Sequence, residues 1–166
     1  MKLSESFDIL LLLSRPEPAI DEPAMLEKIA FQGGESTRVA AYLTTRDPAH
    51  LAFLPGSTPT LYRVRPLRAR EANEIVQALD APTPAELWDV VRACFEGVRG
   101  ENVPTFGEDA FVVIDARRKL RRLTDEAMEV LADFCGLKGV RELGEAVIRR
   151  AVLASSDAAP FALPHG

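Results

Sequence analysis

Apolar side chains in the second half of the chain recur at the spacing of an α-helix. Within residues 87–98 they stand at i, i+3, i+4, i+7, i+8 and i+11, which places them on one helical face. Thr83 precedes this run and is followed by a first-turn proline and by Glu86, which completes a capping box. The pattern predicts a helix that begins after Thr83 and ends at Gly97 or Gly100.

Three other stretches show the same spacing. We expect helices over residues 68–79, 124–135 and 139–153. Thr124 is the expected cap of the second of these helices, and Gly136 is its expected left-handed end.

The stretch from Phe111 to Leu123 fits two structures. Its first four residues are of the types found in a buried strand. A helix would instead place on one face Val113, Ala116, Leu120 and Leu123. We expect the helix, because the spacing persists for three turns in a segment rich in arginine and lysine, which are good helix formers.

The first 58 residues are less regular and contain several prolines. The apolar run within Phe7 to Leu13 suits a buried strand or a partner-facing segment, and is too short for a signal peptide or a membrane span. We expect a short helix at residues 23–32 and one or two helical turns between Asp47 and Leu54. The stretch from Val39 to Leu43 fits a helix or a strand.

Apolar and basic residues alternate between Thr60 and Arg65, which predicts a strand. Together these patterns predict a mainly α fold, a helical domain of about five or six helices with a small β element near residues 60–65. We expect an N-terminal extension with short helices at 1–58, packed on a helical core domain at 59–153, and a C-terminal tail at 154–166.

The composition is that of an ordinary globular protein. Hydrophobic residues make up 47% and charged residues 27% of the chain, which predicts a folded domain. The formal net charge of −5 opposes a general attraction to nucleic acids or anionic membranes. Cys94 and Cys135 lie in expected helices among apolar neighbours, so we expect buried thiols and a cytoplasmic location.

Few residues are suited to catalysis or metal binding. His50 and His165 have no partners nearby in the sequence, and two cysteines alone do not supply a zinc site. The glycines lack both nucleotide-binding fingerprints. We therefore expect no enzyme activity, no metal and no cofactor.

The most conspicuous local feature is a cluster of five cations in six positions. Its members are candidate contacts to phosphate or to a partner: Arg117, Arg118, Lys119, Arg121 and Arg122. A helix bearing them could lie along a nucleic-acid backbone, or the cluster could be the solvated face of an amphipathic helix. We favour the solvated face, because the chain is acidic and no aromatic residue interleaves with the cluster to stack on bases.

Two smaller features remain. The first is a second basic patch on and after the expected strand, which suits either an edge strand protected by charge or a recognition surface; it consists of Arg63, Arg65, Arg68 and Arg70. The second is the pair Phe161 and Leu163, large apolar residues in a tail of small residues. They are candidates for docking on a partner, although such a composition also suits a disordered tail.

The stretch from Leu61 to Leu67, the capped segment from Thr83 to Trp88 and the Thr124 helix start follow one another in an order that resembles small helical tail assembly chaperones and related structural proteins of tailed bacteriophages. The resemblance covers residues 60 to 153. It implies a non-enzymatic helper that binds hydrophobic stretches of a tape-measure protein, or a small component of a virion assembled in the cytoplasm.

We therefore expect a protein-interaction or assembly protein with a protein partner or a homo-oligomer, and no membrane. The alternative is a nucleic-acid-binding module that uses a basic helix at 117–122.

Overall fold

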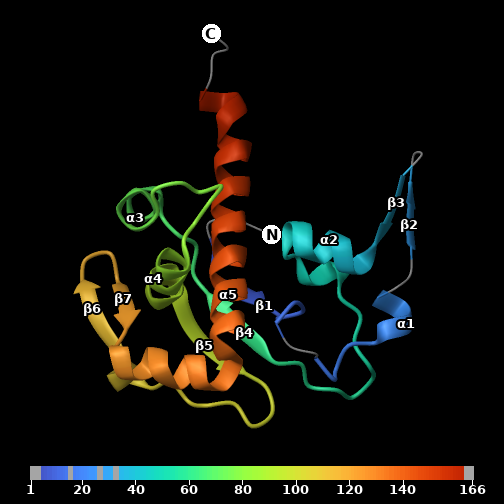
Figure 1. The fold of residues 1–166 in the computed structure, drawn as a ribbon, viewed down its shortest axis with the longest axis horizontal. Helices are drawn as coiled ribbons and strands as arrows, with labels where there is room; N and C mark the ends of the chain where they lie inside the picture. The colour runs from blue at the N-terminus through green and yellow to red at the C-terminus, as the bar shows by residue number, and fades with distance from the viewer. Residues whose placement is uncertain (1–4, 15–16, 26–27, 32–33, 163–166) are drawn as a thin grey trace.

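The computed structural model describes residues 5–14, 17–25, 28–31 and 34–162, and it shows a mixed α/β fold (Figure 1). About 47% of the residues are helical and 17% lie in strands, so the expectation of a mainly α fold is wrong. In chain order the elements are β1 (Phe7–Ile9), α1 (Glu22–Met25), β2 (Lys28–Phe31), β3 (Gly34–Thr37), α2 (Arg38–Thr45), the 3₁₀ turn η1 (Pro48–His50), β4 (Leu61–Val64), α3 (Ala69–Ile75), α4 (Pro84–Cys94), β5 (Phe95–Arg99), the 3₁₀ turn η2 (Glu108–Ala110), β6 (Phe111–Asp115), β7 (Leu120–Leu123) and α5 (Asp125–Ala162).

The main sheet is antiparallel and has the strand order β1-β4-β5. The predicted strand β4 is confirmed, and its alternation buries Tyr62 and Val64 while Arg63 is exposed. Phe7 and Ile9 of β1 are buried in the same core. Since β4 lies between two other strands, the suggestion that its arginines protect an edge strand is wrong.

Helix α4 begins as its capping box predicts. Thr83 Oγ1 accepts a hydrogen bond from the N–H of Glu86 at 3.2 Å, and Glu86 Oε1 accepts one from the N–H of Thr83 at 2.8 Å. The helix ends at Cys94, earlier than predicted, because the chain continues directly into β5 and pairs with β4. Strand pairing far along the chain thus overrides the helical spacing of the last residues.

Helix α5 bends at Gly136, whose φ of 79° lies in the left-handed region. The predicted start is confirmed, because Thr124 Oγ1 accepts a hydrogen bond from the N–H of Ala127 at 3.1 Å. The second half of α5 is a long helix that extends beyond the rest of the fold (Figure 1). Val147 in this half and Val91 in α4 are both fully buried, which confirms that the helical stripes pack together.

A buried carboxylate attaches the segment after β1 to α5. Glu142, only 3% exposed, accepts hydrogen bonds from the N–H groups of Leu12 (2.8 Å), Leu13 (3.0 Å) and Ser14 (2.8 Å) and from the Ser14 hydroxyl (2.8 Å). Arg46 Nη1 completes the set with an ion pair of 2.9 Å. The region expected to be an N-terminal extension therefore contributes β1 to the main sheet and is held to α5 by this cluster.

Elsewhere in the first 58 residues the predictions are partly right. The expected helix at 23–32 is wrong beyond Met25, because residues 28–31 pair with residues 34–37 as the hairpin β2–β3. The ambiguous stretch at 39–43 is helical and lies within α2. The expected turn after Asp47 is confirmed as η1, where Asp47 Oδ1 accepts a hydrogen bond from a backbone N–H at 3.0 Å.

The expected helix over residues 111–123 is wrong, because this segment forms the antiparallel hairpin β6–β7. Leu120 and Leu123 are buried at the two ends of β7, which is only four residues long. These two leucines are three positions apart, which is also the spacing of residues on one face of a helix. The two arginines between them point to opposite faces, as neighbouring residues of a strand do.

Two other helix ends differ from the predictions. Helix α3 ends at Ile75, short of the predicted residue 79. Helix α5 continues through residues 154–162, where a tail was expected; the side chains there lie outside the described part of the molecule. None of the described helices is both long and apolar enough to span a bilayer.

Candidate functional site

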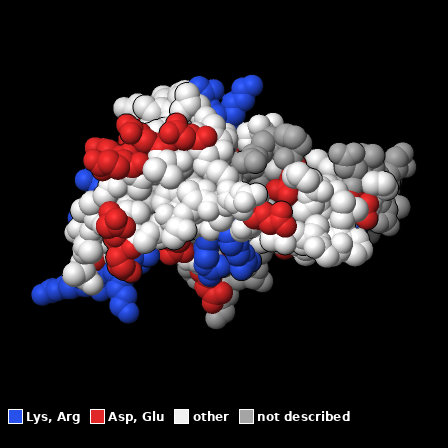
Figure 2. Space-filling model, turned by 90° about the horizontal axis from the view of Figure 1, so that it is seen from below, with Lys and Arg blue, Asp and Glu red and all other residues white. Residues whose placement is uncertain are grey.

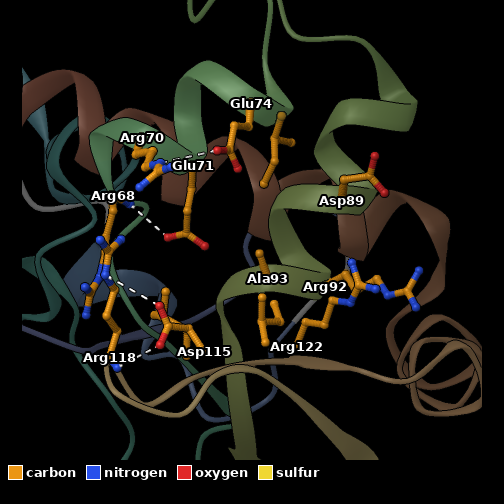
Figure 3. Close-up of a pocket in the computed structure, with 13 residues that line it drawn as sticks. Arg68, Arg70, Glu71, Glu74, Asp89, Arg92, Ala93, Asp115, Arg118 and Arg122 are labelled. Atoms are coloured by element: carbon orange, nitrogen blue, oxygen red, sulfur yellow. Dashed lines mark hydrogen bonds and ion pairs between the residues drawn. The ribbon is translucent and has the colours of Figure 1, made fainter.

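A cleft of about 570 Å³ lies between α3, α4 and the hairpin β6–β7 (Figure 3). Arginine and carboxylate side chains from all three elements dominate its lining, with a few apolar residues between them. The lining residues are Arg68, Arg70, Glu71, Glu74, Ile75, Asp89, Arg92, Ala93, Ile114, Asp115, Arg118, Leu120 and Arg122. We call this surface the arginine cleft.

On the α3 side, Glu71 is fixed by a bidentate ion pair. Arg65 donates two hydrogen bonds to its carboxylate at 2.7 and 2.6 Å, and the N–H of Arg68 donates a third at 3.3 Å. Burial alone would raise the pKa of Glu71, but the hydrogen bonds and the charge of Arg65 hold it below its ordinary value. Glu71 is therefore ionised at neutral pH and unsuited to donate a proton.

On the α4 side, Arg92 connects three elements. Its Nε donates to the carbonyl oxygen of Leu123 at 2.9 Å, and its Nη2 pairs with Asp125 at 2.7 Å. These bonds join α4 to the end of β7 and the start of α5. Asp89, one turn earlier on α4, lines the same side of the cleft (Figure 3).

On the hairpin side, Asp115 shapes the turn between the strands. Its Oδ1 accepts hydrogen bonds from the N–H groups of Arg117 (3.0 Å) and Arg118 (3.3 Å), and its Oδ2 lies 3.6 Å from Arg118 Nε. Lys119 closes the turn with a φ of 56°. This local bonding directs Arg118 towards the cleft.

The hairpin divides the predicted basic cluster among different surfaces. Arg118 and Arg122 line the arginine cleft. The Arg121 guanidinium instead lies 4.0 Å from the centre of the Phe111 ring and 3.7 Å from Glu108. Arg117 and Lys119 are exposed at the turn. The cluster is therefore not one face of a helix.

The second basic patch is divided in the same way. Arg63 lies on the outer face of the main sheet near Asp8 at 3.6 Å, whereas Arg65 is paired with Glu71. The other two members of the patch, Arg68 and Arg70, line the arginine cleft. The structure thus brings parts of both predicted patches to one site.

Five charged residues of the cleft were not predicted as site residues, namely Glu71, Glu74, Asp89, Arg92 and Asp115. Asp89 and Arg92 stand at i and i+3 on α4, outside its buried stripe, so a helical projection of residues 84–94 would have placed them together. The predicted docking residue Phe161 belongs to the last turn of α5 and its side chain is outside the described part, as is the whole of Leu163.

The ionisable groups that line the cleft are all arginines and carboxylates. The lining contains no histidine, cysteine or hydroxyl side chain. Cys94 on α4 is fully buried, and burial raises the pKa of its thiol to about 12, which keeps it protonated. Within the described residues, no group of three or more potential ligands could hold a metal ion.

Ion pairs leave part of the positive charge of the cleft uncompensated. Within the described part of the chain, no ion pair joins the guanidinium of Arg68 or Arg122 to a carboxylate, although the charge of Arg68 contributes to the lowered pKa of Glu71; Arg70 lies 3.5 Å from Glu74. Figure 3 shows Arg68 and Arg118 at one end of the cleft and Arg92 and Arg122 at the other. The cleft can therefore accept carboxylate or phosphate groups at both ends.

Basic side chains do not merge into one continuous field on the face seen from below. There, basic and acidic residues form separate small patches (Figure 2). A broad, sequence-independent attraction to a phosphate backbone would need a continuous basic surface.

Comparison with protein-family models finds no match, and comparisons with curated proteins and with solved structures find none either.

Proposed function

We propose that this chain is a non-enzymatic protein-interaction or assembly protein, and that its arginine cleft binds an extended, carboxylate-bearing segment of a partner protein. The observation that carries the proposal is the pair of guanidinium groups at Arg68 and Arg122, which line a shared cleft and form no ion pair with a carboxylate among the described residues. A planar guanidinium donates a fork of hydrogen bonds that matches a carboxylate, so each can fix one acidic side chain.

The apolar part of the lining favours a polypeptide as the ligand. Ile75, Ile114 and Leu120 lie between the charged groups, and Ile114 is 53% exposed. A segment that alternates acidic and apolar residues would satisfy both kinds of contact. Arginine beside apolar surface is also the composition found at the centres of protein interfaces.

Nucleic-acid binding is the second candidate function. The exposed Arg117 and Lys119 at the hairpin turn favour it, since a projecting β-hairpin can enter a groove. The carboxylates of Glu74, Asp89 and Asp115 in the cleft repel any anionic ligand, but they oppose nucleic acid more, because a phosphate backbone carries a charge at every nucleotide whereas the acidic side chains of a peptide can be spaced to meet the arginines. We therefore place it second.

A narrower form of the first proposal is assembly of a bacteriophage tail in the cytoplasm, with a hydrophobic stretch of a tape-measure protein as the partner. Its support is the resemblance over residues 60 to 153, and the identity of the captured partner would test it.

The main proposal is tested by affinity capture with three forms of the full chain: wild type, Arg68→Glu/Arg122→Glu, and Arg141→Glu. Arg141 is exposed on α5 outside the cleft, so its variant reverses one charge, half the change of the double variant, without touching the site. We expect a partner that is retained by the wild type and by Arg141→Glu and lost with the double variant. Binding of the purified partner should show the same order by fluorescence anisotropy.

Two results would overturn the proposal. One is equal retention of every partner by the wild type and the cleft variant. The other is retained material that disappears after nuclease treatment and binds with a steep salt dependence, which would establish the nucleic-acid alternative.

A further inference from the structure

The outer edge of β6 is unpaired. Strands β6 and β7 form a two-stranded sheet, and no other strand among the described residues pairs with it. Figure 1 shows β6 on the outside of the fold and β7 between β6 and α4. A free strand edge presents unpaired backbone N–H and C=O groups that can pair with another strand.

This edge is also apolar. Three consecutive side chains of β6 are exposed: Val112 by 46%, Val113 by 65% and Ile114 by 53%. Proteins usually protect a free edge with charged residues, proline or a β-bulge; before Asp115 at its end β6 has no charged residue or proline, and its one irregularity is the register shift between Val113 and Asp115. The exposed edge of β6 is therefore suited to pairing with another strand.

We propose that a second copy of this chain covers the edge, by antiparallel pairing of β6 with β6 of the other copy about a twofold axis at Val113. In this register Val113 faces its own symmetry mate, and Val112 of each copy faces Ile114 of the other. The aliphatic triplet is thus complementary to itself, as the interface of a symmetric dimer requires.

The charges that flank β6 support this occupant and this direction. Glu108 and Asp109 precede the strand, and Arg117 and Arg118 follow it. An antiparallel pair brings the acidic start of one copy towards the basic end of the other. Counted on from this register, Arg117 in the turn after β6 stands opposite Asp109 in η2 of the other copy. Parallel pairing would place like charges together, which is unfavourable. The Glu108 side chain is 97% exposed, so it is accessible to a basic side chain of the other copy.

The geometry also favours an assembly of two copies. On its other side β7 lies against α4, which leaves less room for a further strand to add to a dimer with the strand order β7-β6-β6-β7. The register shift between Val113 and Asp115 keeps the paired stretch short. An interface of this size is below that of tight permanent dimers, so we expect a dissociation constant in the micromolar range.

The inference goes beyond the proposed function, because it concerns backbone pairing at the outer edge of β6, although Ile114 and Arg118 also line the arginine cleft. Sedimentation velocity over a range of concentrations tests it on the full chain. We expect a monomer–dimer equilibrium for the wild type and a dimer weakened about tenfold or more by Val113→Lys, which places two ammonium groups together at the twofold axis. Val130→Lys is the control, since Val130 is 45% exposed on α5 and leaves the edge intact.

A charge swap gives an independent test. Arg117→Glu alone and Asp109→Arg alone should each weaken the dimer, whereas the double variant should restore it, because each copy again offers opposite charges. These substitutions are at exposed positions, so they stay informative if Val113→Lys does not fold. A wild type that stays monomeric at every concentration overturns the inference, as does a dimer that is indifferent to Val113→Lys or to the swap. Neither outcome affects partner binding at the cleft, which the Arg68→Glu/Arg122→Glu variant measures separately.

Discussion

Replacing Glu142 by glutamine should destabilise the protein strongly, because a neutral amide cannot replace the buried carboxylate. One oxygen, Oε2, accepts from the N–H of Leu12 and from Arg46, while Oε1 accepts from the backbone N–H groups of Leu13 and Ser14 and from the Ser14 hydroxyl. In glutamine one of these oxygens becomes an NH₂ group. Whichever is replaced, at least two donors then face another donor.

The magnitude follows from burial. A buried donor without an acceptor costs about 1–3 kcal/mol, and removing one partner of a buried ion pair costs about 3–5 kcal/mol. These contributions overlap, since the Arg46 side chain, only 5% exposed, is one of the donors that lose their acceptor. We therefore expect a loss of about 3–5 kcal/mol from the free energy of unfolding, a large share of a typical total of about 5–15 kcal/mol.

Urea unfolding followed by circular dichroism measures the loss. Glu145→Gln is the matched control, because Glu145 lies on the same helix and is exposed. Its substitution should change the free energy of unfolding by no more than about 0.5 kcal/mol. A free energy of unfolding for Glu142→Gln that lies within about 1 kcal/mol of the wild-type value at neutral pH would refute the reasoning. It would mean that the five hydrogen bonds to the carboxylate add no net stability.

The pH dependence gives a second reading of the same site. Burial alone would raise the pKa of Glu142, but the hydrogen bonds from Leu12, Arg46 and Ser14 outweigh burial and lower it. A lowered carboxyl pKa adds stability above the unfolded-state value of about 4.3, and this stability is lost as the pH falls through the folded-state value. The difference in free energy of unfolding between wild type and Glu142→Gln should therefore be constant near neutral pH and become smaller in acid. A difference that stays constant at every pH would contradict a lowered pKa of Glu142.

Three further variants or reagents test the packing. Gly144→Ala should destabilise by about 1–3 kcal/mol, because its Cβ would lie 2.9 Å from a backbone oxygen of α4, whereas Gly97→Ala has open space and should be nearly neutral in the same urea titration. Thr83→Ala should cost about 1 kcal/mol by removing the capping box, and Thr105→Ala in an exposed loop should not. The Cys94 thiol should react with Ellman's reagent only after unfolding; rapid reaction of the native protein would contradict its burial.

Local rules in the sequence predicted how helices begin, and long-range pairing decided where several of them end. The caps at Thr83 and Thr124 are confirmed because a cap uses atoms only three residues apart. The end of α4 at Cys94 was not predictable in this way, since it depends on β5 pairing with β4, more than thirty positions away. The kink at Gly136 was predictable, because glycine adopts a left-handed φ without a steric cost.

The candidate site was predicted only in part for the same reason. The basic cluster was visible as a run of cations, but its division between the cleft, the turn and the Phe111 ring depends on the pairing of β6 with β7. A strand directs neighbouring side chains to opposite faces, so Arg121 and Arg122 separate, whereas a helix would have kept most of the cluster on adjoining surfaces. The same pairing exposes the aliphatic residues of β6 that a helix would have turned towards the core. Which side chains line the cleft and which are exposed was therefore set by a choice between helix and hairpin that residues 111–123 leave open when considered alone.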